Sequence, residues 1–103
     1  MKGENYMSDE RETEVREAAR AAVGVLQRDG WCQWTLCTPD GRRCMVGSVH
    51  VVAAPAVAEE VFDRARRVIG KNLLVAWNDE PRRTVDEVVS VLERVAAGEG
   101  ASS

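Results

Sequence analysis

Apolar residues recur at helical spacing over most of the chain, which predicts long amphipathic helices. The first apolar series begins after Ser8, a good N-cap residue, and stops before Gly30, which suits the position just past a last helical turn. The second series begins at Pro55, a residue favoured in a first turn, and stops before Gly70. These signals predict one helix within each of the two intervals.

A third helix is predicted near the C-terminus, where Thr84 and Glu87 have the spacing of a capping box. Residues 47–54 are ambiguous, because their valines favour a strand while their length and alanine-rich exit favour a short helix. Residues 72–79 are interpreted as a short apolar connector, since Pro81 interrupts any helix that would continue through it.

The sharpest local signal is the sequence TPDG at residues 38–41, which is typical of a type I turn followed by a glycine in the left-handed conformation. With apolar flanks it predicts a small β-hairpin over about residues 33–46. In the register that this turn sets, the residues expected on the apolar face are Cys32, Trp34, Leu36, Cys44 and Val46. Those expected on the opposite face are Gln33, Thr35, Cys37, Arg43 and Met45.

The predicted fold is therefore mainly α, a compact domain of three to four helices with one small β-hairpin. A chain of 103 residues can build one modest core. We expect residues 8–97 to form this single helical domain, and residues 1–7 and 98–103 to be disordered tails. Because the apolar residues are mostly valine and alanine, the three tryptophans are expected to supply much of the bulk of the core.

Charge and composition limit the classes of partner. The net charge of −3 combines acidic ends with a mildly basic middle. The positive electrostatic potential of the middle is too weak to indicate nucleic-acid binding. No apolar run approaches the roughly 18 residues of a membrane span, so no membrane association is expected. An odd number of cysteines implies no closed disulfide framework and favours a reducing, cytoplasmic location.

Three arginine pairs support an alternative function, that of a nucleic-acid-binding accessory protein. The pairs are Arg42-Arg43, Arg66-Arg67 and Arg82-Arg83. Acidic residues lie between them along the chain, and no aromatic residues alternate with them as binding of a single strand would require. We therefore interpret the arginines as part of a solvated surface of mixed charge and do not expect nucleic acid as the main partner.

A second alternative is a zinc-binding or thiol protein, because every cysteine and the single histidine lie within twenty residues. These potential ligands are Cys32, Cys37, Cys44 and His50. In the predicted hairpin Cys37 and Cys44 point to opposite faces, so they could share neither a metal nor a disulfide. His50 also lies off the spacing that would stack it on Cys44 in a helix, which disfavours a nucleophile–base pair. We therefore expect no metal, no other cofactor and no enzymatic activity.

Four short motifs give the chain a resemblance to a known family. They are Gly30-Trp31-Cys32, Cys44-x-x-Gly47, Trp77-Asn78-Asp79 and Arg83-Thr84. With these motifs the chain resembles, over residues 15–96, a family of small proteins from actinobacteria and their phages that is classed only as a domain of unknown function. The resemblance implies a compact, mainly helical cytosolic domain, with residues 44–54 helical. It implies no activity.

The function expected from the sequence is that of a small non-catalytic interaction or regulatory protein of actinobacterial or phage origin. Its partner would be an unidentified protein. The candidate binding residues are Trp31, Trp34, Trp77, Asn78, Asp79 and Arg83. The Trp-Asn-Asp stretch could instead be structural, a core tryptophan followed by an Asx turn, and this interpretation is favoured. Valine-rich helix faces add the expectation of a homodimer.

Overall fold

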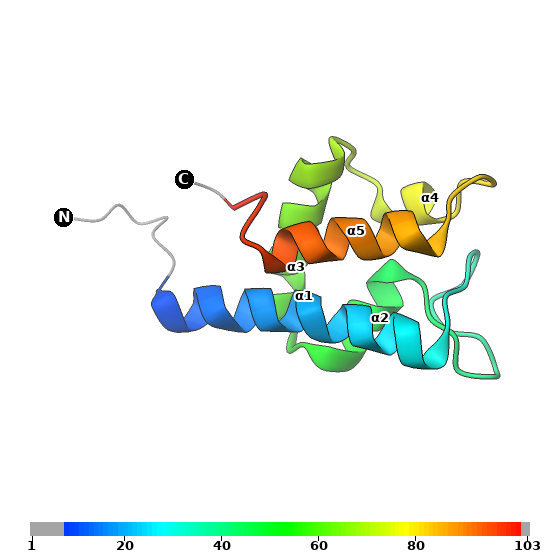
Figure 1. The fold of residues 1–103 in the computed structure, drawn as a ribbon, viewed down its shortest axis with the longest axis horizontal. Helices are drawn as coiled ribbons and strands as arrows, with labels where there is room; N and C mark the ends of the chain where they lie inside the picture. The colour runs from blue at the N-terminus through cyan, green and yellow to red at the C-terminus, as the bar shows by residue number, and fades with distance from the viewer. Residues whose placement is uncertain (1–7, 102–103) are drawn as a thin grey trace.

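The computed structural model describes residues 8–101, which fold into five helices (Figure 1). The helices are α1 (Asp9–Asp29), α2 (Met45–Val52), α3 (Pro55–Ile69), α4 (Leu74–Asn78) and α5 (Val85–Ala96). Within this described part of the chain no helix is both long and apolar enough to span a bilayer. The tail predicted for residues 1–7 lies outside the described residues.

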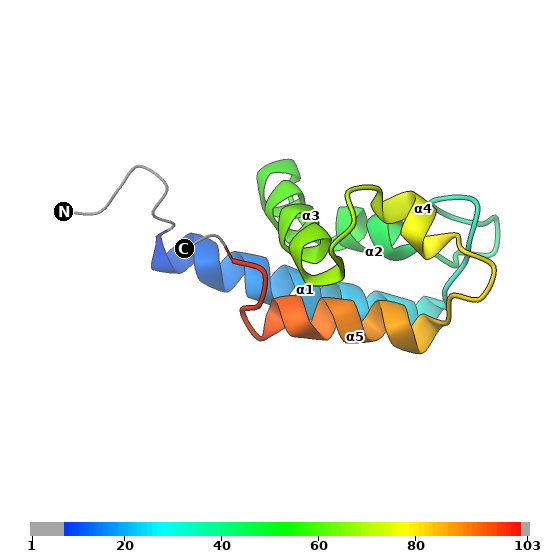
Figure 2. The same cartoon turned by 90° about the horizontal axis from the view of Figure 1, so that it is seen from above.

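The helices form two layers. In one layer α1 and α5 lie side by side and run in opposite directions (Figure 1). In the other, α3, α2 and α4 follow one another along the length of α1 and α5 (Figure 2). The α1–α2 loop (residues 30–44) and the connection from α4 to α5 lie together at one end of the molecule, which we call the loop end.

The helix signals in the sequence are confirmed. The side chain of Ser8 accepts a backbone N–H from the first turn of α1, and Gly30 caps the other end. Pro55 opens α3 and Gly70 ends it in the left-handed conformation. Thr84 opens α5 with the predicted capping box. The ambiguous segment is helical up to Val52, as the family resemblance implied, whereas Ala53 and Ala54 lie outside the helix. The apolar connector contains the short helix α4.

The core consists of small and branched side chains, and the tryptophans contribute less to it than predicted. Its most buried members include Val15, Ala19, Met45, Val49, Val61, Val88, Leu92 and Val95. Trp31 and Trp77 are only half-buried at its edge, and Trp34 is 72% exposed. The expected bulk is supplied instead by Met45 and Phe62.

The prediction of a β-hairpin over residues 33–46 is wrong. The described residues contain no strand, and the loop has two isolated bridges, which join Trp31 and Cys37 to the same residue, Arg43. The turn at its tip is correct, because the N–H of Gly41 donates to the carbonyl of Thr38 at 2.9 Å and Gly41 has a positive φ of 93°.

The hairpin is cut short because α2 starts earlier than predicted. Cys44 is the N-cap of α2, and its Sγ accepts the N–H of Gly47 at 3.3 Å. The carbonyl of Leu36 lies so close to Gly47 that a Cβ there would overlap it. The Cys44-x-x-Gly47 motif therefore combines a helix cap with a close approach of the α1–α2 loop, which only glycine permits.

The two predicted faces of the hairpin are mixed in the structure. Cys32 and Cys44 are buried, as expected, whereas Trp34 and Leu36 of the same predicted face are exposed. Met45, expected on the opposite face, is fully buried in the core. The alternation of a strand fails because Trp34 has a left-handed backbone, with φ of 76°, which turns the loop round.

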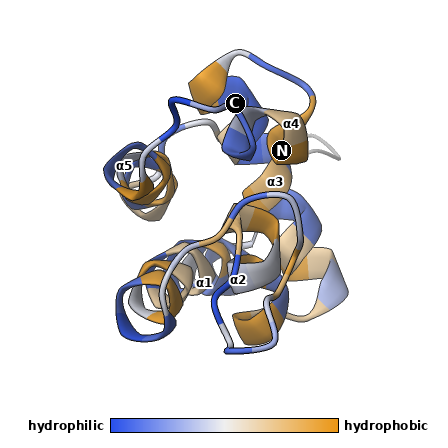
Figure 3. Ribbon diagram, turned by 90° about the vertical axis from the view of Figure 1, so that its right-hand side faces the viewer, coloured by the Kyte–Doolittle hydropathy of each residue, from blue (hydrophilic) through white to orange (hydrophobic). Residues whose placement is uncertain are grey.

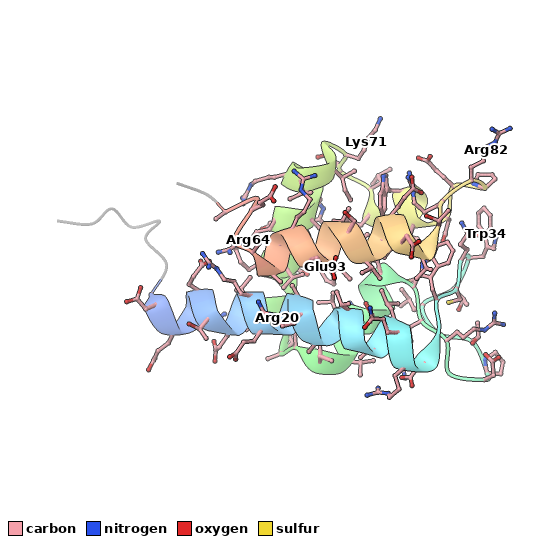
Figure 4. The ribbon with its side chains drawn as sticks, viewed as in Figure 1. Arg20, Trp34, Arg64, Lys71, Arg82 and Glu93 are labelled. Atoms are coloured by element: carbon pink, nitrogen blue, oxygen red, sulfur yellow. The ribbon has the colours of Figure 1, made fainter. Side chains whose placement is uncertain are left out.

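A buried ion-pair cluster, not foreseen from the sequence, joins α1 to α3. Arg64 is 1% exposed and donates to both carboxylate oxygens of Glu12, at 2.7 and 3.0 Å, and to Glu60 at 2.9 Å (Figure 4). The Arg64 guanidinium, with a smaller contribution from Arg16, lowers the pKa of Glu12 from its ordinary 4.5 to about 2. The cluster thus fixes the crossing of α1 and α3 on the side away from the loop end.

The start of the segment predicted as a C-terminal tail is held by contacts. Glu99 pairs with Arg94 of α5 at 2.7 Å, and the carbonyl of Gly100 accepts from Arg67 of α3 at 2.7 Å. Residues 102–103 lie outside the described part.

Candidate interaction surface

Asn78, fully buried at the end of α4, ties three segments of the loop end together. Its Oδ1 accepts the indole N–H of Trp31 at 2.7 Å and the N–H of Met45, the first residue of α2, at 3.1 Å. Its Nδ2 donates to the carbonyl of Cys32 at 3.1 Å and to Oδ1 of Asp79 at 2.9 Å. These four bonds use the full hydrogen-bonding capacity of the side chain. Asn78 therefore locks α4 to the α1–α2 loop and to α2.

A second set of bonds holds the following residues of the same loop. Oδ1 of Asp79 accepts the backbone N–H of Trp34 at 2.9 Å. Nε2 of Gln33 donates to the carbonyls of Asn78 and Glu80, at 3.0 and 2.7 Å. Gln33 was not singled out in the sequence, since a lone glutamine gives no recognisable signal. Together with the bonds of Asn78, these contacts form what we call the loop lock.

The remaining two predicted binding residues form a separate pair beside the loop lock. The guanidinium of Arg83 lies 3.8 Å from the centre of the Trp77 ring, and its Nε donates to the Trp77 carbonyl at 2.9 Å. Arg83 also pairs with Glu80 at 3.1 Å and with Glu87 at 3.3 Å. This pair joins the end of α4 to the first turn of α5, and its charge is matched by two carboxylates.

The loop lock presents Trp34 to solvent. The ring is 72% exposed at the loop end, where it points away from the helices (Figure 4). Leu36, two residues on, is 49% exposed. Figure 3 looks onto this end and shows the α1–α2 loop in front of α1 and α2. A left-handed backbone at a bulky residue costs roughly 1–2 kcal/mol, so the surrounding bonds must enforce this conformation.

The four potential metal ligands are not gathered. Cys32 and Cys44 are buried, and burial raises the pKa of both thiols. Cys37 is exposed on the loop, and His50 is exposed on α2 with its ring edge against Phe62, 5.3 Å between ring centres. In residues 8–101 no three His, Cys, Asp or Glu side chains lie close enough together to hold a metal ion.

Most of the paired arginines have local partners. Those engaged are Arg42 with Asp40, Arg66 with Asp63, Arg67 with the Gly100 carbonyl, and Arg83 with Glu80 and Glu87. Arg43 and Arg82 form no ion pair with any residue that the structure describes. Carboxylates therefore neutralise half of the six arginines, while Arg43, Arg67 and Arg82 keep their positive charge. Nucleic-acid binding stays an alternative prediction.

The chain matches a family model over residues 10–98, which is described as "Family of unknown function (DUF6197)". No curated protein and no solved structure is similar enough to the chain to count as a match. The resemblance to a family of unknown function is therefore confirmed, while an actinobacterial or phage origin stays a prediction.

Proposed function

The chain belongs to DUF6197, a family of unknown function, and from this premise we propose that it is a small non-catalytic interaction protein that binds a partner protein through Trp34. The observation that carries the proposal is the display of Trp34, a ring 72% exposed on a left-handed backbone. Leu36, two residues further along the loop, is also exposed.

Both features of Trp34 are unfavourable for the isolated protein. Exposed tryptophan surface forgoes about 25 cal/mol for every Å² that could be buried, and the left-handed backbone adds its own cost. Tryptophan is also the residue type most enriched among the dominant residues of protein interfaces. A partner with a pocket for the indole would recover the free energy that the free protein forgoes.

The loop lock supports the proposal because it fixes the anchor before binding. Asp79 accepts the Trp34 N–H, and Asn78 in turn holds Asp79 and the preceding residues of the loop. A side chain whose backbone is already held in one conformation loses less conformational entropy when it binds. On this proposal Asn78 and Asp79 of the Trp-Asn-Asp motif position the loop, and the exposed residues make the contact.

The test is photo-cross-linking in the native cell. A photoreactive amino acid replaces Thr35, which is exposed next to the anchor and leaves Trp34 intact. The matched control position is Glu93, exposed on α5 (Figure 4). We expect a discrete adduct from position 35 that position 93 does not give and that Trp34→Ala removes. Equal adducts from both positions, or an adduct that survives Trp34→Ala, would refute the proposal.

A further inference from the structure

A second apolar feature lies away from the loop lock, around the short connector before α4. Leu73 is 72% exposed, and hollows of about 590 and 370 Å³ lie on either side of it. The larger hollow, which we call the α3–α4 groove, has Phe62 and Val75 in its walls. The surface thus carries both an exposed apolar side chain, Leu73, and an adjacent groove with apolar walls into which such a side chain could fit.

Leu73 is not the only exposed apolar residue of the groove. Val75 of α4, which also lines it, is 46% exposed. The helix α2 contains no acidic, lysine or arginine residue, and its single titratable side chain is His50. A face with few charges can meet an identical face without repulsion between like charges.

The charges at the rim of the groove are arranged with opposite signs at its two ends. Glu59 and Arg66 both line it and lie seven residues apart on α3, with Phe62 between them. Seven residues are about two helical turns, or about 10 Å along the axis, and both residues are on the same side of the helix. Arg66 also binds Asp63 at 2.9 Å, whereas Glu59 has no ion pair among the described residues.

We infer that this face binds a second copy of the chain about a two-fold axis, with Leu73 of each copy in the α3–α4 groove of the other. Two copies of α3 then run in opposite directions across the axis. Glu59 of one copy faces Arg66 of the other, and the reverse pair forms at the other end. The arrangement is self-complementary in shape and in charge, which an interface between identical surfaces requires.

The inference does not rest on the valine stripes from which a homodimer was first expected, because those of α1, α3 and α5 are buried in the core of the monomer. It is also independent of the proposed role of Trp34, since the two surfaces share none of their contact residues. Dimerisation and partner binding can therefore be measured, and can fail, separately.

The first test is the molar mass in solution by sedimentation equilibrium over a range of concentrations. The wild-type chain, with a monomer mass of 11.3 kDa, is expected to sediment as a dimer at the upper concentrations. Leu73→Glu places a charge in the apolar contact and is expected to give a monomer. Ser90→Glu adds the same charge at an exposed position of α5 and is expected to leave the dimer unchanged.

The second test exchanges the two charges. Glu59→Arg alone sets two arginines against each other at each end and is expected to weaken the dimer by at least about tenfold. The double exchange Glu59→Arg with Arg66→Glu restores both pairs and is expected to recover it. Circular dichroism and the Tm of each variant establish that the monomer is folded, since Arg66 also binds Asp63.

A wild-type chain that stays monomeric at every concentration would overturn the inference, as would a dimer that Leu73→Glu leaves intact. Failure of the double exchange to recover the association, with both variants folded, would overturn the antiparallel geometry. Leu73→Glu could instead abolish the adduct formed from position 35 and leave the molar mass in sedimentation equilibrium unchanged. The groove would then bind another protein, and the inference would be wrong.

Discussion

Replacing Asn78 with alanine removes all four hydrogen bonds at the centre of the loop lock. The indole N–H of Trp31, the N–H of Met45 and the carbonyl of Cys32 each lose their Asn78 partner. The carboxylate of Asp79 loses one donor but keeps the N–H of Trp34.

The structure allows the cost to be worked out. A buried polar group left without a partner costs about 1–3 kcal/mol, and one that can reach water costs less. Met45 and Cys32 are buried, so each is assigned about 1–1.5 kcal/mol, while the half-buried Trp31 adds about 0.5 kcal/mol. Asn78→Ala is therefore expected to lower the free energy of unfolding by about 3 kcal/mol. That is a large share of the roughly 5–15 kcal/mol typical of a domain.

Urea denaturation followed by circular dichroism measures this loss without relying on the fluorescence of Trp31, whose surroundings the substitution changes. With a slope of about 1–1.5 kcal/mol/M, the midpoint is expected to fall by about 2–3 M. Asn72→Ala is the matched control, since Asn72 is exposed and its side chain makes no hydrogen bond to a described residue. Its effect is expected to stay within about 0.5 kcal/mol. A loss below about 1 kcal/mol for Asn78→Ala, or one equal to the control, would show that the loop lock does not hold the loop end together.

Three further predictions concern the rest of the fold. Glu12→Gln is expected to cost up to about 3 kcal/mol at neutral pH, because the depressed pKa of Glu12, about 2 against an ordinary 4.5, is a stabilisation of up to that size. This contribution is complete above about pH 4.5 and is lost as the pH falls towards 2, so the two stability curves should converge in acid, and parallel curves would contradict the prediction. Gly47→Ala is expected to destabilise the protein by about 1–3 kcal/mol, because the new Cβ overlaps the carbonyl of Leu36. Gly24→Ala, which adds a Cβ in open space on α1, is expected to stabilise it by up to about 1 kcal/mol. Urea midpoints of the two variants that move in the same direction would refute this contrast. A thiol reagent is expected to modify Cys37 quickly and the two buried cysteines only on unfolding, and fast reaction of a second thiol in the native protein would contradict the structure.

The helices could be predicted because their signals are local. The N-cap at Ser8, the capping box at Thr84 and the glycine at Gly70 each act within a turn of the helix, so the sequence nearby contains the necessary information. The apolar stripes between them set which faces are buried.

The α1–α2 loop could not be predicted in the same way, because residues far away in the sequence determine its path. A correct turn at residues 38–41 suggested a hairpin, but Asn78 and Asp79 bind backbone groups that a strand ladder would have used. The early start of α2 depends on a cysteine acting as N-cap, an uncommon choice that gives a weak signal.

For the candidate binding residues, too, local motifs could be predicted from the sequence and contacts between distant residues could not. The motif at residues 77–79 could be found from the sequence, but its role as a lock depends on bonds to residues 33 or more positions away. The display of Trp34 could not be anticipated, since alternation in a hairpin placed its ring in the core. The exposure of Leu73 depends on where α4 packs, which no local pattern specifies.

The most direct test of the central proposal is the affinity of the purified partner, identified through the adduct at position 35, for the chain with Trp34→Ala. A dominant interface tryptophan contributes about 2 kcal/mol or more, so Kd is expected to rise about 30-fold or more, while Glu93→Ala leaves it within about twofold. An unchanged Kd for a Trp34→Ala variant that is folded as the wild type would contradict the role assigned to Trp34.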